Sequence, residues 1–537
     1  MPASLGTKPT RTNLKSALLT LGFTLFAAQY PCLANDAPAT AASTNPFDVL
    51  ELRVLGNTAL DARTVEAAVY PFTGPTKHMA DVEAARAALE RTYHDHGFGT
   101  VFVDIPEQSV DDGIVRLRVS EARLHQVRVT GAKYFSGRQI LAEVPAAKSG
   151  TVPDLPELQR ELTALNAQTR DRTVVPVLKA GTEPATVDLA LRVEDHLPLH
   201  GSVELNNQRT ADTTHLRALI QASYDNLFGR LDSLSFQYQA TPESPRESHV
   251  FAGNYTLRLG SAGSGLSFLY VDSKSAVSTV GTLGVLGTGS VYGLRWMNPL
   301  PVSDSAQSIA LEADYKSFSQ SINVSSGSGL NTPIDYISLS AAYSGARNAA
   351  KLQADWTTSL NFGFSRAPYN ADQFADKRYG ALPNYFYIRS EGGLTWLLPA
   401  QFSAALRLSG QYAVDPLISN EQMAIGGAFS VRGYLEAEEL GDSALRGSLQ
   451  LGAPPLVLLS GRLRFDEFAF YDLARDFTLD PLADQPRHSD LRSWGLGLKM
   501  DGGSRLYGAL TWAYPLIDGS RTLKGSPMLL FVIRGSL

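Results

Sequence analysis

The second half of the chain is a long series of short segments in which apolar and polar residues alternate. In the segment 233–239, Leu234, Phe236 and Tyr238 alternate with serine and glutamine. Successive side chains of a β-strand point to opposite faces, so each segment predicts a strand with one apolar and one polar face. The pattern begins near Gly201 and continues to the C-terminus, recurring at 251–259, 309–316, 337–344 and 406–412.

Two architectures produce such alternation: a soluble sandwich with apolar faces inward, and a membrane barrel with apolar faces outward. Three observations favour the barrel. The segments approach the roughly 9–11 residues that cross a bilayer, aromatic residues lie near their ends, and the series never breaks into a second domain. We predict a transmembrane antiparallel barrel at 197–537 with about 16 strands, an even number as bacterial barrels require. Its final strand, 528–537, should close on the first.

The N-terminus has the pattern of a secretory signal peptide. A basic segment precedes an apolar run at 17–28, which is too short to span a bilayer. Small residues around Ala34 suit cleavage, which predicts a signal peptide at 1–34 and a polar linker at 35–46. The chain has a single cysteine, Cys32, so no internal disulfide can form. About ten residues between the cleavage site and Phe47 are too few for a helix that would plug the barrel.

Residues 47–196 repeat one order of elements, namely strand, two helices and two strands. Helical spacing of alanine and leucine ends in each repeat before turn residues, and alternating strands follow. This predicts two small α+β domains, at 47–124 and 125–196. The expected elements are strands at 47–55, 101–105 and 114–119 with helices at 61–69 and 81–94, then strands at 125–129, 174–178 and 186–193 with helices at 136–143 and 155–165.

A glycine-rich stretch at 426–434 contains an arginine, Arg432, between small and aromatic residues. Glycine lets a turn fold back on itself, and an arginine at its tip can make a forked contact with a carboxylate. Asp472 is a candidate, because it shares the polar, inward face of its predicted strand with Phe470 and Asp466. The alternative is a surface arginine and an unrelated strand aspartate.

The segment Val431, Arg432, Gly433 and Tyr434 resembles the signature of outer-membrane two-partner secretion transporters, the TpsB family of haemolysin and adhesin export. The resemblance implies that this segment lies at the tip of an extracellular loop folded into the pore, facing a Phe-x-Asp motif, here Phe470 and Asp472. The pair would act as a latch that fixes the loop. The family motif continues with glycine two residues after the aspartate, whereas this chain has Ala474.

The two small domains resemble polypeptide-transport-associated (POTRA) domains in motifs at 105–108, 112–113, 119–122 and 187–189. The resemblance implies export of a specific partner protein, captured unfolded by strand addition and passed through the pore without nucleotide. It places the barrel in the outer membrane, in contact with lipid, and the POTRA domains in the periplasm, in a monomer inserted by the barrel assembly machinery. The alternative is an assembly factor or insertase of the same superfamily. A diffusion porin would leave the repeats unexplained.

Other function classes find no support in the sequence. The formal net charge of −6 argues against a nucleic-acid partner, and no nucleophile elbow, P-loop or C-x-x-C motif occurs. We therefore expect no enzyme activity, no catalytic residue and no cofactor. His94 and His96 at the end of a predicted helix could suggest a metal, but two histidines there are more often a polar helix end. We expect no metal site.

Overall fold

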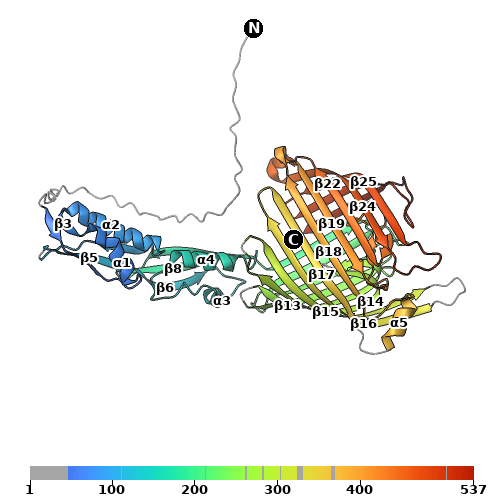
Figure 1. Cartoon of the computed structure of the whole chain (residues 1–537), viewed down its shortest axis with the longest axis horizontal. Coiled ribbons are helices and arrows are strands. Elements are labelled where there is room, and N and C mark those ends of the chain that lie inside the picture. The colour runs from blue at the N-terminus through green and yellow to red at the C-terminus, as the bar shows by residue number, and fades with distance from the viewer. Residues whose placement is uncertain are drawn as a thin grey trace, which may run out of the picture. The chain divides into compact units, whose positions relative to one another are not determined.

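The computed structural model describes residues 46–110, 112–211, 213–260, 263–280, 283–302, 304–322, 330–364, 369–503 and 505–537 (Figure 1). The predicted signal peptide and nearly all of the predicted linker lie outside these ranges. Within them, no helix combines the length and the apolar character needed to cross a bilayer.

The first α+β domain contains a three-stranded sheet in the order β2-β5-β4, with β2 parallel to β5. Asp61 caps the first helix by accepting a hydrogen bond from the Thr64 amide. The elements are β1 Phe47–Val49, β2 Glu51–Leu55, α1 Ala62–Val69, a 3₁₀ turn Tyr70–Phe72, β3 Gly74–Lys77, α2 Met79–Asp95, β4 Val101–Asp104 and β5 Ile114–Glu121. The short strands β1 and β3 pair with each other.

The second α+β domain has the same topology, with sheet order β6-β8-β7 and β6 parallel to β8. Its elements are β6 Arg123–Thr130, α3 Gly137–Ala142, α4 Leu155–Asn166, β7 Arg172–Ala180 and β8 Thr186–Asp195. The predicted order of strand, two helices and two strands is therefore confirmed in the second repeat, whereas the first repeat adds the short pair β1 and β3, which the sequence does not predict.

The repeat extends to local geometry after the first strand of each domain. Gly56 and Gly131 have φ angles of 91° and 86°. A Cβ on either would lie 2.4 Å from a carbonyl oxygen, that of Val119 or that of Val193. Only glycine combines this backbone conformation with so close an approach.

A carboxylate closes the same turn in each domain. Glu121 accepts hydrogen bonds from two backbone amides that follow Gly56, at 2.7 and 2.8 Å. Asp195 accepts from three amides that follow Gly131, at 2.9, 2.8 and 3.1 Å. The two domains thus share one local plan at this turn.

The rest of the described chain forms a closed antiparallel barrel of 16 strands (Figure 1). The strands are β9 Leu199–Asn206, β10 Arg217–Leu227, β11 Asp232–Ala240, β12 His249–Leu259, β13 Ser264–Val280, β14 Leu283–Leu300, β15 Ala306–Ile322, β16 Leu330–Asn348, β17 Leu352–Phe364, β18 Phe386–Leu397, β19 Ser403–Ala413, β22 Ser443–Gly452 with β23 Leu456–Leu458, β24 Leu463–Phe477, β25 His488–Asp501, β26 Leu506–Pro515 and β27 Met528–Ser536. Both β22 and β23 pair with β24, so they are one strand interrupted at Pro454 and Pro455. As predicted, the last strand closes on the first, with Val532 opposite Asn206.

The apolar sides of the barrel strands face outward, as expected. On β16 Leu339 and Tyr343 are each 40% exposed, whereas Ser338 and Ser340 on the other face are half-buried. An outward row of aromatic rings crosses five successive strands, with centroids 5.1–6.3 Å apart, from Phe236 through Phe251, Tyr270 and Tyr292 to Tyr315. Such rows are typical of the aromatic belts of membrane barrels.

The two ends of the barrel differ in their connections. At the end where Leu199 begins β9, the turn end, connections are short. At the other end, the loop end, most are longer, although only residues 281–282 join β13 to β14. The sequence of the tract Trp512–Leu516 suggests a short turn on the periplasmic side, but that interpretation is wrong. Its first four residues complete β26, and residues 516–527 form a loop at the loop end.

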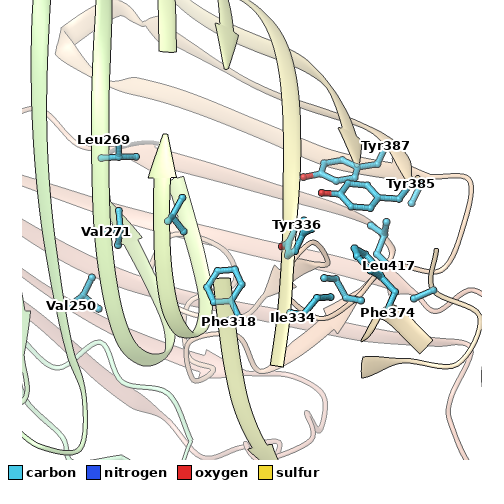
Figure 2. Packing of buried hydrophobic residues seen from close by; sticks show 14 of the residues in the cluster. Val250, Leu269, Val271, Phe318, Ile334, Tyr336, Phe374, Tyr385, Tyr387 and Leu417 are labelled. Atoms are coloured by element: carbon cyan, nitrogen blue, oxygen red, sulfur yellow. The ribbon is translucent and has the colours of Figure 1, made fainter. Parts of the chain in front are cut away.

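An apolar cluster fills the barrel interior near the loop end (Figure 2). Helix α5 Tyr369–Lys377 supplies Phe374, which is fully buried and packs edge-on against Tyr336 of β16 at 5.5 Å. Leu417 and Ile418, which follow β19, are also fully buried in this cluster. The cluster therefore brings the connection after β17 and the connection after β19 against the inner wall.

Candidate functional site

The candidate site is built on residues 414–442, which connect β19 to β22 and which we call the lumen loop. The loop contains a small hairpin of β20 Met423–Ile425 and β21 Glu439–Gly441, and the glycine-rich stretch lies between these strands. Its side chains contact the inward faces of β15, β16, β18, β22 and β24. The loop therefore lies inside the barrel, as the sequence predicts.

Arg432 forms a forked ion pair with Asp472 of β24. The Arg432 Nε and Nη2 atoms lie 2.7 Å from the two carboxylate oxygens, and the Arg432 backbone amide donates to the same group at 3.1 Å. Asp472 is fully buried, and the Arg432 side chain is 13% exposed. The two residues singled out in the sequence are thus brought together in the fork that a planar guanidinium favours.

The wall around this pair completes its hydrogen bonds. Ser448 accepts from Arg432 Nη2 at 3.0 Å and donates to Asp472 at 2.6 Å. The guanidinium carbon lies 3.5 Å from the centroid of the Phe470 ring, which explains the aromatic residue two before the aspartate. Removing one member of such a buried pair costs about 3–5 kcal/mol, because the other charge remains buried.

The neighbours of Arg432 hold the loop against the same wall. Val431 is fully buried in an apolar cluster with Ala474 and Leu491. Ala474, which stands where the family motif has glycine, therefore contributes its methyl group to this packing. Gly433 has a φ of 93°, and a Cβ there would lie 3.2 Å from the Cβ of Ala513 on β26, so the loop backbone packs directly on the strand.

Tyr434 lies further along this wall, with its hydroxyl 2.9 and 2.8 Å from the carbonyl oxygens of Arg492 and Ile517. Its single hydrogen donates to one of them at a time. Burial raises the pKa of the Tyr434 phenol, so it stays a neutral donor. The four signature residues therefore each contact the wall formed by β24, β25 and β26.

A second attachment, which the sequence analysis missed, lies at the start of the lumen loop. Glu421 is 2% exposed and accepts hydrogen bonds from Lys316 Nζ at 2.7 Å and from the hydroxyls of Tyr336 and Tyr387 at 2.6 and 2.9 Å. Figure 2 shows both tyrosines within the interior cluster. Burial acts to raise the pKa of Glu421, but Lys316 and the three hydrogen bonds outweigh burial and hold the pKa below its ordinary value.

A third attachment joins the end of the lumen loop to two neighbouring connections. Asp442 is fully buried and forms a forked pair with Arg378, which follows α5. The same carboxylate accepts from the backbone amides of Leu417 and Leu479 at 2.9 and 2.7 Å. Sequence reasoning missed both Glu421 and Asp442 because their partners lie on other strands and loops, with no spacing signal.

Two more glutamates of the lumen loop have distinct surroundings. Glu438 accepts from the amides of Arg521 and Thr522, at 2.7 and 2.5 Å, and so joins the loop to residues 516–527. Glu436 accepts from the Ala428 amide at 2.8 Å. Burial raises the pKa of Glu436 from 4.5 to about 7, against the lowering effects of the Ala428 amide, Arg217 and Arg446.

The histidines at the end of α2 contact backbone carbonyl oxygens, as polar side chains at a helix end commonly do. His94 Nε2 lies 3.1 Å from the Val101 carbonyl oxygen, and His96 Nδ1 lies 2.7 Å from that of Thr92. Elsewhere among the described residues, Asp171, His200 and Asp225 place their ligand-type atoms within 4.8 Å of one another. His200 Nε2 lies 3.0 and 3.4 Å from the two carboxylates, within hydrogen-bonding distance of both.

Comparison with known proteins decides the family. The family model of the haemolysin secretion/activation protein ShlB/FhaC/HecB matches residues 186–500, and the model of the ShlB-type POTRA domain matches residues 47–122. The chain belongs to the haemolysin secretion/activation family. It is therefore a two-partner secretion transporter of the outer membrane, which confirms the resemblance drawn from the signature residues.

Named relatives have the same class of activity. The outer membrane transporter CdiB of Dickeya dadantii is 21% identical over 405 residues, covering 73% of this chain and 69% of the relative. The heme/hemopexin transporter protein HuxB of Haemophilus influenzae is 21% identical over 417 residues, covering 72% and 69%.

Solved structures share the fold. CdiB from Escherichia coli superposes with a TM-score of 0.57 at 17% identity, over 93% of each chain. BamA from Haemophilus ducreyi lacking POTRA domains 1–3 superposes with a TM-score of 0.56 at 13% identity, over 91% of this chain and all of that one.

Proposed function

We propose that this transporter exports one specific partner protein in extended form through the barrel lumen, with the lumen loop held inside during transport. The observation that carries this proposal is the forked pair between Arg432 and Asp472. It fixes the signature segment to one wall of a closed barrel whose inward side chains are largely polar. In this proposal Val431, Arg432, Gly433 and Tyr434 form the latch, and Phe470 and Asp472 are its partners on the wall.

The POTRA domains would capture the client by strand addition. In each three-stranded sheet two strands lie at an edge, β2 and β4 in one and β6 and β7 in the other. Strand β7 is 9 residues long and pairs with β8 on one side in the described part of the chain. Backbone hydrogen bonds to such an edge suit an unfolded client, because they place little demand on its sequence.

The proposed setting is a monomeric barrel in outer-membrane lipid, inserted by the barrel assembly machinery, with the POTRA domains in the periplasm. The outward aromatic row and exposed leucines support contact with lipid. The proposal requires no nucleotide, no other cofactor and no catalytic residue. Folding of the client outside the cell would supply the direction of transport.

Deletion of this chain tests the proposal. We expect one large protein to disappear from the culture medium and from the cell surface, while other outer-membrane barrels keep their normal amounts. Return of that protein on complementation completes the test. Normal release of every exported protein by the deletion strain would overturn the proposal.

The same experiment distinguishes the export function from the alternative function of an assembly factor or insertase. That alternative is worth testing because the fold is similar to that of BamA. An insertase would lower the amounts of several unrelated barrels in the outer membrane on deletion, and no single exported protein would be lost from the medium.

A further inference from the structure

One side of the lumen loop faces an open cavity. The cavity has a volume of about 560 Å³ and lies between the lumen loop and the inward faces of β15 to β18. Its floor on β16 and β17 is a row of small, mostly hydroxyl-bearing side chains, which we call the hydroxyl wall. The hydroxyl wall consists of Ser338, Ser340, Ala342, Ser344, Thr357, Ser359 and Asn361.

On its other side the lumen loop packs directly on the described residues of the barrel wall. There the inward residues of β24 to β26 are covered by the loop: Asp472, Leu491, Ser493 and Ala513 are all fully buried, and Phe470 is 5% exposed. Residues of the hydroxyl wall are instead half-buried. A chain that crosses the barrel with the loop in place has room on the hydroxyl wall and none against Asp472.

The chemistry of the hydroxyl wall suits a passing polypeptide of any sequence. Serine and threonine hydroxyls can both donate and accept hydrogen bonds, so they replace water around an extended backbone without selecting a side chain. Some charges beside the wall are paired, as Arg295 is with Glu312 at 3.6 Å. The hydroxyl wall itself carries no charged side chain, so it offers a passing client hydrogen bonds and no ionic contact.

The lumen loop presents one aromatic side chain to the same cavity. Phe429 lines the cavity and is 81% exposed, although a phenylalanine gains free energy from burial. An exposed ring opposite a hydroxyl wall can pack transiently on apolar side chains of a client as they pass.

The cavity ends where Glu421 meets the wall. Along β16 the inward residues run from Ser344 near the turn end to Ser338, and then to Tyr336, whose hydroxyl donates to Glu421. Lys316, Tyr387 and Glu421 all line the cavity at this end. Their hydrogen bonds therefore close the hydroxyl wall on the side of the loop end.

We propose that the client chain crosses the barrel between the lumen loop and the hydroxyl wall. Glu421 must then leave Lys316 and the two tyrosines to open the passage, while Arg432 stays on Asp472. This inference rests on the proposed export function and adds the route, the wall that binds the extended backbone, and the attachment that gives way.

Site-specific photo-cross-linking tests the route in the full-length transporter in cells. The probe is the protein that the deletion strain fails to release, with a disulfide-bonded folded domain fused to its C-terminus so that it stalls in transit. A photoreactive residue replaces Ser340 or Ser359 on the hydroxyl wall. Matched controls are Leu339 and Leu360, the outward neighbours on the same strands, which are 40% and 39% exposed. A further position, Ala509 on β26, samples the opposite wall.

The expected result is cross-linked client at Ser340 and Ser359, and background signal at Leu339, Leu360 and Ala509. Cross-links at Ala509 with none on the hydroxyl wall would overturn the route while leaving export intact. If the deletion strain loses no exported protein, the proposed function itself fails, and that outcome is seen before any cross-linking. As a second readout, Phe429→Ala should reduce the rate of export, and Phe429→Leu should restore much of it. An unchanged rate of export in Phe429→Ala would show that the Phe429 ring does not assist the passage of the client.

Discussion

The tip and the start of the lumen loop are attached to the barrel in physically different ways. At the tip, between β20 and β21, the planar Arg432 guanidinium meets a fully buried carboxylate through two hydrogen bonds of 2.7 Å and stacks on Phe470. At the start the Glu421 carboxylate receives single hydrogen bonds from an ammonium and two phenols on three different strands, beside an open cavity. Arginine forks are rigid, whereas lysine is a flexible point charge. The comparison indicates one fixed attachment and one that can open.

The largest expected effect is on the fixed attachment. Arg432→Ala should abolish release of the partner protein while the barrel still inserts, because it leaves Asp472 buried without a counterion, at a cost of about 3–5 kcal/mol. Asp472→Ala should share this phenotype. Secreted protein in the medium and barrel content of the outer membrane are the measurements.

The matched control for Arg432 is Arg407→Ala. Arg407 is 73% exposed and lies 3.7 Å from Asp355, so its loss should cost only about 0–1 kcal/mol. Normal secretion by Arg432→Ala would eliminate the latch as a requirement for export.

The next effect concerns Asp442, which joins the end of the lumen loop to Arg378 and Leu479 and, through the Leu417 amide, to the start of the loop. In Asp442→Asn, the Leu417 and Leu479 amides should exchange with solvent roughly a hundredfold faster, since breaking the pair costs about 3 kcal/mol. Hydrogen exchange of the detergent-solubilised protein measures this.

Asp490→Asn is the matched control for Asp442, because Asp490 pairs with Arg475 on the outward face and both are partly exposed. Equal exchange rates in wild type and Asp442→Asn would show that Asp442 does not hold the loop.

A smaller and opposite effect is expected at Glu421. Glu421→Gln removes the charge that attracts Lys316 but keeps a side chain of the same size. We expect longer and more frequent open events in planar-bilayer conductance, with export retained. Glu194→Gln, at a residue of the second α+β domain that is 67% exposed and 3.8 Å from Arg192, should behave as wild type. Loss of export in Glu421→Gln, with unchanged conductance, would mean that this attachment is fixed as well.

The smallest expected effect is a pH dependence from Glu436. Its pKa is raised from 4.5 to about 7, so between these values the folded state binds a proton that the unfolded state has lost. The free energy of unfolding therefore falls as pH rises from 4.5 to about 7. Because the side chain is only half-buried, we expect a loss of about 1 kcal/mol. Urea unfolding should show this fall in wild type and its absence in Glu436→Gln; equal slopes in both would contradict the assignment.

The sequence predicts most of the architecture, because the period-two alternation, the repeated element order and the glycine-rich signature are all local signals. Arg432 and Asp472 could be paired because one lies in a recognisable motif and the other has the right strand parity. Glu421, Asp442 and Arg378 could not be paired, since their contacts depend on how three connections fold into one barrel. The tract at 512–516 suggests a turn but completes β26, because a proline can end a strand as readily as it can begin a turn.

A disulfide that locks the lumen loop to one wall tests the central claim most directly. A Cβ at Gly433 would lie 3.2 Å from the Cβ of Ala513, close to the roughly 3.5–4.5 Å of disulfides. Cys32, the single cysteine of the chain, lies in the predicted signal peptide. In the double variant Gly433→Cys/Ala513→Cys, export is measured with the cysteine pair reduced, when the loop is free, and oxidised, when the loop is locked. Because both measurements use the same variant, any strain from the substitutions affects them equally. The account predicts equal export in both states, because the loop stays on this wall while the client passes along the other. Export that proceeds when the pair is reduced and stops when it is oxidised would contradict the account.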